Sequence, residues 1–507
     1  MKPPGLRDRA GGTANRHPEA HMSYAPRPLS TRLTAAVALL AIAAACATNP
    51  VTGQREVSLM SEAQEVSIGQ QVDVDIRNEM GVYDDPELQR YVSDLGVRLA
   101  KVSHRPQLPW HFTVVDNAAI NAFAAPGGYI YITRGILAYM QDEAELVGVL
   151  GHEIGHVTAR HAAQQYTRAT GGTLGLIALG IFVPAARPFG DLASTGLGLL
   201  FLKYGRDDEL QSDRLGVEYG AAAGWDPLGV PRFLRTLSRV SEMSERGVPN
   251  WLSTHPEPAS RVEVARPLAE AQAAGRELAR NREAYERRID GVVFGDNPKD
   301  GIVRGNAFLH PVLRFAIEFP EGWEVQNTPQ QVMARAPGQQ RYMLLQIVQK
   351  PNGRDIEQIA VNHMTTGGFQ RVSGERTRIN GLDAYLGVYR GAIEGLGQVG
   401  MRTGHIVMPD RTVYVVAGFA PQAQYDAVNP VATASIQSFR QLTRQQAEEI
   451  RPNRLDFYTV RAGDTWQSIA QGASRGLVTA PTLAIMNGAE LDAQPRTGTR
   501  IRIVVVG

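Results

Sequence analysis

The chain has 507 residues, which is too long for a single compact core, so we expect two to four domains. Its 43% hydrophobic and 20% charged residues are typical of globular proteins and exclude a disordered chain. The net charge of +1 gives no electrostatic reason for a nucleic-acid partner, and a single cysteine excludes an internal disulfide or a thiolate metal cluster. Any metal site must therefore use histidine and carboxylate ligands.

A short apolar stretch near the N-terminus predicts an export signal. Residues 33–45 read LTAAVALLAIAAA, follow Arg27 and Arg32, and are too few to span a membrane comfortably. The long leader before this stretch leaves open whether translation starts at Met1 or at Met22.

The apolar stretch ends at Cys46, the only cysteine of the chain. Residues 42–46 (IAAAC) resemble a bacterial lipobox, with Ala43 where leucine is usual. This resemblance implies a signal peptide over 1–46, a lipid on Cys46, and a periplasmic protein anchored to the outer membrane. The alternative is an ordinary cleavage site beside an incidental cysteine.

The next segments predict a mixed helical and strand region. Residues 61–105 read as helix, with Ser61 and Gln64 as a capping box, and residues 110–115 and 128–133 read as strands. Residues 142–168 give the clearest helix, capped by Asp142. Residues 171–202 are apolar and rich in glycine, and we expect a buried hairpin or loop, a membrane-contacting segment or, slightly preferred, a flexible lid. A second helix is predicted over 206–222, and helices continue to about residue 290.

The helix predicted over 142–168 carries the motif H-E-x-x-H as His152, Glu153 and His156. Residues four apart share one helix face, so both imidazoles can bind one Zn²⁺. Glu153 beside them can act as general base toward zinc-activated water. His161 falls one residue short of the spacing of a third histidine ligand, which favours a packed histidine there. The alternative for the whole motif is a pair of surface histidines in salt bridges.

A third ligand must come from another segment, and Glu209 and Asp213 are the candidates. They lie four residues apart on the helix predicted over 206–222, so one can bind zinc while the other orients a ligand histidine or assists proton transfer. By pattern alone, a solvated acidic helix face explains them equally well.

These motifs together resemble the HtpX-like and CAAX-prenyl-protease family of zinc metallopeptidases, which pairs H-E-x-x-H with a later E-x-x-x-D. The resemblance covers roughly residues 47–270 and implies one zinc per chain, held by His152, His156 and Glu209. It also implies Glu153 as catalytic base and Asp213 as proton donor. Gln211 and Ser212 depart from the usual second motif, which is richer in Glu and Ala.

The branch of periplasmic β-barrel assembly-enhancing proteases looks most similar. NPVTGQREVSLMSEAQE, NAFAAPGGYIYITRGIL and LSTHPEPASR carry this likeness. It implies a fourth, displaceable zinc ligand at His255 that keeps the enzyme latent; a loop histidine is the alternative. It also implies an edge strand that pairs with an extended substrate, through residues Asn121, Phe123, Gly127 and Gly128.

Two further domains are predicted after a linker near 291–310. Residues 300–445 alternate strand-like and helical runs and predict a small α+β domain without a recognisable chemical motif. Residues 455–507 resemble a LysM module, a βααβ unit that binds peptidoglycan, although a structural cap without ligand is the alternative. The residues that fit the LysM pattern are Val460, Gly463, Asp464, Thr465, Ile469, Asn487, Gly498 and Ile501.

The sequence thus predicts a multidomain α+β protein with a mainly helical zincin-type metallopeptidase domain over 47–290, which includes a small edge-strand sheet. We expect a zinc endopeptidase of the bacterial envelope that cleaves unfolded or misassembled polypeptides. The alternatives are a zinc-dependent peptidoglycan hydrolase and a non-enzymatic envelope chaperone or scaffold with a latent zinc site.

Overall fold

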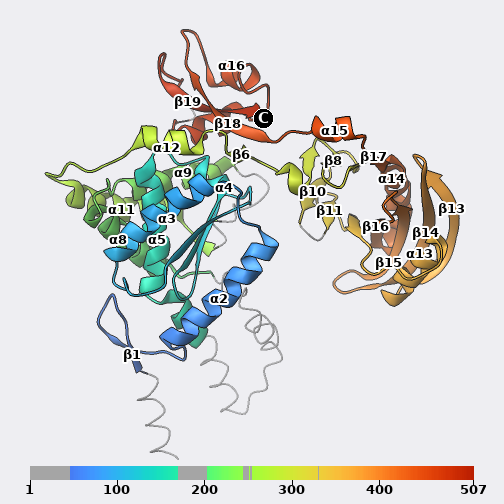
Figure 1. Ribbon diagram of the computed structural model, residues 1–507, viewed down its shortest axis with the longest axis horizontal. Coiled ribbons are helices and arrows are strands. Elements are labelled where there is room, and N and C mark those ends of the chain that lie inside the picture. The colour runs from blue at the N-terminus through green and yellow to red at the C-terminus, as the bar shows by residue number, and fades with distance from the viewer. Residues whose placement is uncertain (1–45, 169–202, 244–250, 252–253, 329–330, 491) are drawn as a thin grey trace, which may run out of the picture.

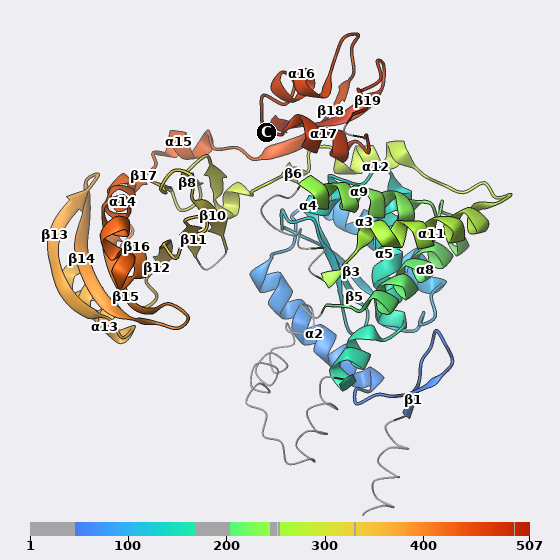
Figure 2. The same cartoon turned by 180° about the vertical axis from the view of Figure 1, so that it is seen from behind.

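The computed structural model describes residues 46–168, 203–243, 251, 254–328, 331–490 and 492–507. The expected signal segment before Cys46 and the expected lid at 171–202 therefore lie outside the described residues, apart from Cys46 itself. Figures 1 and 2 show a helical domain (residues 46–289), a β-rich domain set to one side of it, and a C-terminal module seated on top of the helical domain. No helix among these residues has the length and apolarity needed to cross a membrane.

The helical domain surrounds a small mixed sheet in the order β3-β5-β4. In this sheet β3 is parallel to β5, and β4 is antiparallel to β5 and forms the outer edge. The strands are β3 (His111–Val115), β4 (Ala122–Ala125) and β5 (Tyr129–Thr133), and β1 (Cys46–Thr48) pairs with β2 (Arg55–Val57) as a separate hairpin. The helices are α2 (Glu62–Glu79), α3 (Pro86–Lys101), α4 (Arg134–Leu137), α5 (Glu143–Thr158), α8 (Arg206–Ala222), α9 (Gly229–Met243), α11 (Pro258–Ala273) and α12 (Arg282–Ile289).

The structure corrects two predicted helix lengths. The helix expected over 61–105 is two helices, because the capping box at Ser61 starts α2 and Asp85 with Pro86 starts α3 after a break at Gly81, whose φ is 71°. The helix expected over 142–168 begins as predicted at the N-cap Asp142, but α5 ends at Thr158. Arg160 just beyond has a φ of 61°, which a continuous right-handed helix excludes, and helix resumes over 161–168.

The β-rich domain consists of two antiparallel sheets. A seven-stranded sheet has the order β10-β11-β12-β16-β15-β14-β13, and a four-stranded sheet has the order β17-β9-β8-β7. Strands of the first are β10 (Glu324–Asn327), β11 (Val332–Arg335), β12 (Tyr342–Ile347), β13 (Gln370–Ile379), β14 (Leu382–Ile393), β15 (Gly397–Val407) and β16 (Val413–Pro421). Those of the second are β7 (Ile302–Arg304), β8 (Ala307–His310), β9 (Phe315–Glu318) and β17 (Arg440–Gln441). The helices are η3 (Pro298–Asp300), α13 (Ile356–Thr366), η4 (Gln422–Gln424), α14 (Tyr425–Ser438) and α15 (Arg444–Glu448). The predicted linker at 291–310 thus contains strands.

The C-terminal module runs β18 (Asn453–Thr459), α16 (Trp466–Gln471), α17 (Ala480–Met486) and β19 (Arg500–Val506), the strand-helix-helix-strand order that the sequence predicts. Its sheet has the order β19-β18-β6, and β6 (Val293–Phe294) directly follows the helical domain. The β-rich domain is therefore inserted between two paired strands, and its ends return to the same place in the fold. Several residues of the LysM-like pattern stabilise the module itself: Thr465 caps α16, and Asn487 pairs with the main chain of Arg502.

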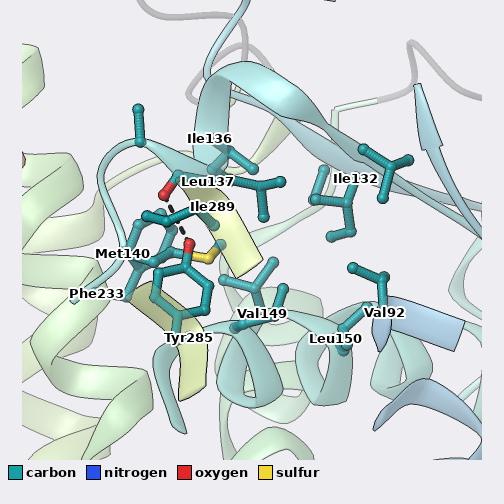
Figure 3. Close-up of a cluster of buried hydrophobic side chains, with 14 of the residues drawn as sticks. Val92, Ile132, Ile136, Leu137, Met140, Val149, Leu150, Phe233, Tyr285 and Ile289 are labelled. Atoms are coloured by element: carbon teal, nitrogen blue, oxygen red, sulfur yellow. Dashed lines mark hydrogen bonds between the residues drawn. The ribbon is translucent and has the colours of Figure 1, made fainter. Parts of the chain in front are cut away.

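One hydrophobic core joins the helical domain to this module. Side chains of α5, α9 and α12 form a continuous buried cluster with Leu455, Trp466, Leu483 and Ile503 of the module, whereas the β-rich domain has separate cores. Figure 3 shows the part of this cluster around α5, where the hydroxyl of Tyr285 donates to the carbonyl of Leu137 at 2.6 Å. The module thus shares the core that supports α5.

Candidate metal centre

Two helices meet closely enough to bring their polar residues together. A β-carbon on Gly151 would lie 3.0 Å from the α-carbon of Gly216, and one on Gly155 would lie 3.1 Å from the α-carbon of Ser212. Because these positions on α5 lack side chains, α8 approaches at main-chain distance. The close approach places Glu209 of α8 beside His156 of α5, with 3.4 Å between Oε1 and Nε2.

Four buried groups converge at this helix pair: His152, His156, Glu209 and His255, with donor atoms all within 4.8 Å of one another. The two Nε2 atoms of His152 and His156 are 3.0 Å apart, and Nδ1 of His255 is 3.3 Å from His152 and 3.0 Å from Glu209. Tetrahedral ligands at zinc distances of about 2.0–2.1 Å lie roughly 3.3–3.4 Å from each other. The donor set and its spacing therefore fit one tetrahedral zinc ion.

Hydrogen bonds behind the two motif histidines point their Nε2 lone pairs at the centre. Nδ1 of His152 donates to Asp213 at 2.9 Å. Nε2 of His161 bonds Gln211 at 2.9 Å, which leaves its Nδ1 to accept from Nδ1 of His156, also at 2.9 Å. His161 is thus a buried histidine that orients a neighbour, in agreement with the sequence analysis. Burial also holds the pKa of His156 well below its ordinary value, which favours the neutral ring that binds metals.

Arg261 of α11 is a site residue that the sequence analysis missed. Its guanidinium bonds both carboxylate oxygens of Asp213, at 2.7 and 2.8 Å, and forms an ion pair with Glu209 at 2.5 Å without hydrogen-bond geometry. Burial of Asp213 raises its pKa, but the charge of Arg261 and the hydrogen bonds from Arg261 and His152 together hold the pKa below the ordinary value. The only sequence signal was its place one helical turn after Pro258, six residues beyond His255.

The carboxylate of Glu153 lies next to the cluster of four donor groups. Its side chain is fully buried, and neither carboxylate oxygen has a hydrogen-bond partner among the described residues. Burial raises its pKa to about 8 in the metal-free protein, and a nearby cation favours the carboxylate. Oε1 of Glu153 is 3.7 Å from Nε2 of His255. A buried carboxylate that is not tied to other side chains suits proton transfer.

His255 is held over the centre by the segment that precedes α11. Its ring stacks on Trp251 with 4.1 Å between centroids, and its main-chain N–H donates to the carbonyl of Trp251. The N–H of Trp251 in turn donates to the carbonyl of Ile120, which precedes the edge strand β4. The segment therefore joins the fourth candidate ligand to the edge of the sheet.

The predicted substrate strand is the outer strand of its sheet, but its residues differ in placement. Phe123 is buried and stacks on Tyr131, and Oδ1 of Asn121 is buried without a hydrogen-bond partner among the described residues. Gly127 and Gly128 lie in the turn after β4 with φ values of 80° and 102°. A β-carbon on Gly127 would lie 2.5 Å from the α-carbon of Val66, so this glycine is required by the close approach of α2.

The comparisons with known proteins cover this centre. Residues 86–269 match the model of Peptidase family M48, a range that includes every site residue from Asn121 to Arg261. The β-barrel assembly-enhancing protease of Escherichia coli (strain K12) is 34% identical over 229 residues, 43% of this chain and 46% of that protein. The mitochondrial metalloendopeptidase OMA1 of Arabidopsis thaliana is 30% identical over 210 residues, 40% of this chain and 41% of that protein. The chain thus spans less than half the length of these curated relatives.

Proposed function

We propose that the protein is a zinc-dependent endopeptidase that cleaves unfolded or misassembled polypeptides of the bacterial envelope, because residues 86–269 match the model of Peptidase family M48. One observation carries the proposal: four buried donor groups surround one point, and the unpartnered carboxylate of Glu153 lies beside them. Histidine nitrogen with one carboxylate is a donor set that zinc prefers.

The residues around the centre suit peptide hydrolysis. Bound zinc supplies Lewis-acid chemistry, which polarises the scissile carbonyl and makes water a stronger acid. Glu153 takes the proton of the attacking water and returns it to the leaving amine, since both its oxygens are free of other hydrogen bonds. Asp213 and Arg261 keep His152 oriented as a ligand, so proton donation by Asp213 itself is disfavoured while it is paired with Arg261.

Substrate binding by strand addition is part of the proposal. β4 is the outer strand beside α5, and an extended polypeptide paired with it would lie along the helix that carries the metal ligands. The similar protein from E. coli is named for β-barrel assembly enhancement, which supports envelope polypeptides as substrates.

We also propose that His255 keeps the enzyme latent. Its Nδ1 takes the fourth donor position, and its ring blocks the space between Glu153 and the centre. Catalytic zinc sites keep one position open, whereas structural sites are closed by four protein ligands. Displacement of the His255 side chain by a substrate would open that position. If His255 is never displaced, the alternative of a non-enzymatic envelope scaffold with a latent zinc site holds instead.

Anchoring in the periplasm completes the proposal. A lipid on Cys46 would attach the chain to the outer membrane, and the βααβ element order supports a LysM module that binds peptidoglycan. Mass spectrometry of the mature N-terminus tests the lipid, and sedimentation of the protein with purified peptidoglycan sacculi tests the module. An unmodified terminus away from Cys46 would remove the lipid anchor from the account.

Cleavage assays with two kinds of substrate test the function. Zinc-loaded protein of residues 47–507 is incubated with a reduced, unfolded model protein and, separately, with purified peptidoglycan. We expect cleavage of the unfolded protein, loss of cleavage with a zinc chelator, and a gain of at least fivefold in His255→Ala. Cleavage of peptidoglycan alone would favour the cell-wall hydrolase. No cleavage by either variant would favour the scaffold.

A further inference from the structure

The β-rich domain contains a cavity of about 290 Å³ that no part of the proposed chemistry uses. It lies at the open end of the layer between the two sheets and is bordered by β8, β9, β11, β12 and β16. Its volume is near the lower end of the range for small-ligand sites, about 300–1,000 Å³. The cavity therefore has room for one large side chain, such as that of tyrosine or tryptophan.

The walls are aromatic and aliphatic. Phe308 and Phe315 are buried, and Leu345 and Ile347 of β12 complete the apolar lining. Tyr414 lies against Phe315 with 4.9 Å between ring centroids. Among the described residues of the lining, Lys299 and Asp300 are charged, and His310, Asn327, Thr328, Gln331 and Gln346 are polar.

Two polar groups of the lining are available to a ligand. Tyr414 is only 3% exposed, but its hydroxyl is not among the fully buried polar atoms without a partner, so it is accessible from the cavity. Nδ1 of His310 accepts from the main chain of Leu313 at 3.3 Å, and burial lowers the pKa of His310 to about 4. The neutral ring must then carry its proton on Nε2, which has no partner among the described residues. Ligand sites usually combine apolar side chains with a few accessible polar groups.

The surroundings of the cavity suit a polypeptide. Val312 and Leu313 adjoin its lining and are 65% and 42% exposed, so an apolar rim faces solvent. β10 is a free edge of the seven-stranded sheet and ends at Asn327, which lines the cavity. An extended chain that added to β10 would carry its side chains past the opening.

The cavity also lies on the side of the β-rich domain that faces the helical domain. Figures 1 and 2 both show β8, β10 and β11 on that side. Lys299 lines the cavity and pairs with Asp116 of the helical domain at 2.5 Å. One polypeptide could therefore contact the cavity and continue across the junction.

We propose that this cavity binds an aromatic side chain of the unfolded polypeptide that the enzyme cleaves, with the polypeptide extended along β10. The inference rests on the proposed function. Folded proteins bury their aromatic side chains, so a site for such a side chain would select unfolded chains. Tyr414 and His310 would pair with the hydroxyl or ring N–H of a bound tyrosine or tryptophan, or with its main chain.

Binding to the inactive holoprotein tests the inference without any cleavage. Zinc-loaded Glu153→Gln protein is titrated, by fluorescence anisotropy, into two labelled unstructured peptides that differ only by one tyrosine or alanine. We expect the tyrosine peptide to bind at least tenfold more tightly. Ile347→Trp, which fills the cavity from β12 on the same sheet face as Leu345 and Tyr414, should abolish that preference, whereas Gln340→Trp on an exposed turn should keep it.

A second variant guards against misfolding of Ile347→Trp. Val312→Ser with Leu313→Ser changes only exposed side chains and should weaken the tyrosine peptide at least threefold. Equal binding of the two peptides, or an unchanged preference in the cavity variants, would overturn the inference. In the active protein, Ile347→Trp should raise KM for a long unfolded substrate and leave kcat unchanged. Absence of all cleavage, with the binding preference intact, would instead count against the proposed function alone.

Discussion

Arg261 holds both oxygens of the Asp213 carboxylate, and Asp213 in turn accepts the Nδ1 proton of His152. All three side chains are almost fully buried. The metal-facing orientation of His152 therefore depends on a cation from a third helix. Glu209 also relies on this cation for charge compensation.

Replacement of Arg261 is expected to destabilise the metal-free protein strongly. Arg261→Gln leaves two buried carboxylates without their cation, and breaking a buried ion pair costs about 3–5 kcal/mol. Urea unfolding in the presence of a chelator measures the free energy of unfolding of the metal-free protein. Arg266→Gln on the same helix, where no ion pair is present, is the control and should change the free energy of unfolding by less than about 0.5 kcal/mol. Equal effects of the two variants would contradict the role given to Arg261.

The contact between Gly155 and Ser212 predicts a metal-binding defect. A β-carbon at Gly155 would be 3.1 Å from the α-carbon of Ser212 and 3.2 Å from its carbonyl oxygen, so Gly155→Ala must push α8 away from α5. We expect zinc affinity, measured by competition with a chromophoric chelator, to fall roughly tenfold or more. Gly220→Ala is the matched control, because its new methyl group meets only Val147 at 3.6 Å, an ordinary contact. Unchanged affinity in Gly155→Ala would show that the helices can separate without cost to the site.

The shared core predicts that the C-terminal module unfolds together with the helical domain. Arg502 is buried and donates to the carbonyl of Ala138 and to Gln141, both just before α5. Arg502→Met leaves these acceptors unpaired and should lower the free energy of unfolding by about 3 kcal/mol. Arg500→Met, two residues away and half-exposed, is the control. In calorimetry, Arg502→Met should shift the transition of the helical domain and leave that of the β-rich domain in place; a shift confined to a separate module transition would refute the shared core.

The β-rich domain is expected to lose stability in mild acid. His405 is buried, and burial together with His363 lowers its pKa to about 3, below the unfolded value of about 6.5. The unfolded state therefore binds more protons, so the stability contributed by this group is complete above pH 6.5 and is lost as the pH falls toward 3. From pH 8 to pH 5 the expected loss is about 2 kcal/mol. Hydrogen exchange of β15 peptides, corrected for intrinsic rates, measures this loss of stability. In His405→Gln the stability should depend less steeply on pH. An equally steep pH dependence would contradict the assignment to His405.

Local patterns predicted His152, Glu153 and His156, the family resemblance assigned Glu209 and His255 to the centre, and long-range contacts were not predictable from the sequence. Helical spacing alone paired His152 with His156 and Glu209 with Asp213, and the Asp142 cap fixed where α5 begins. The contact of Arg502 with Gln141 joins residues 361 positions apart, and nothing near either residue indicates it. Similarly, the local sequence indicates only an ordinary helix-surface arginine at position 261. Its role at the centre depends on the packing of α11 against α8. The short strands β6 and β7 were missed because two or three residues do not establish an alternation.

The most direct test of the account combines metal content with activity in one variant. Wild type and Glu153→Gln are purified as residues 47–507, their zinc is counted by elemental analysis, and cleavage of an unfolded model protein is followed. The account predicts one zinc per chain in both proteins, and cleavage by wild type that falls at least a hundredfold in Glu153→Gln. Equal cleavage by the two zinc-loaded proteins, or absence of zinc from wild type, would contradict it.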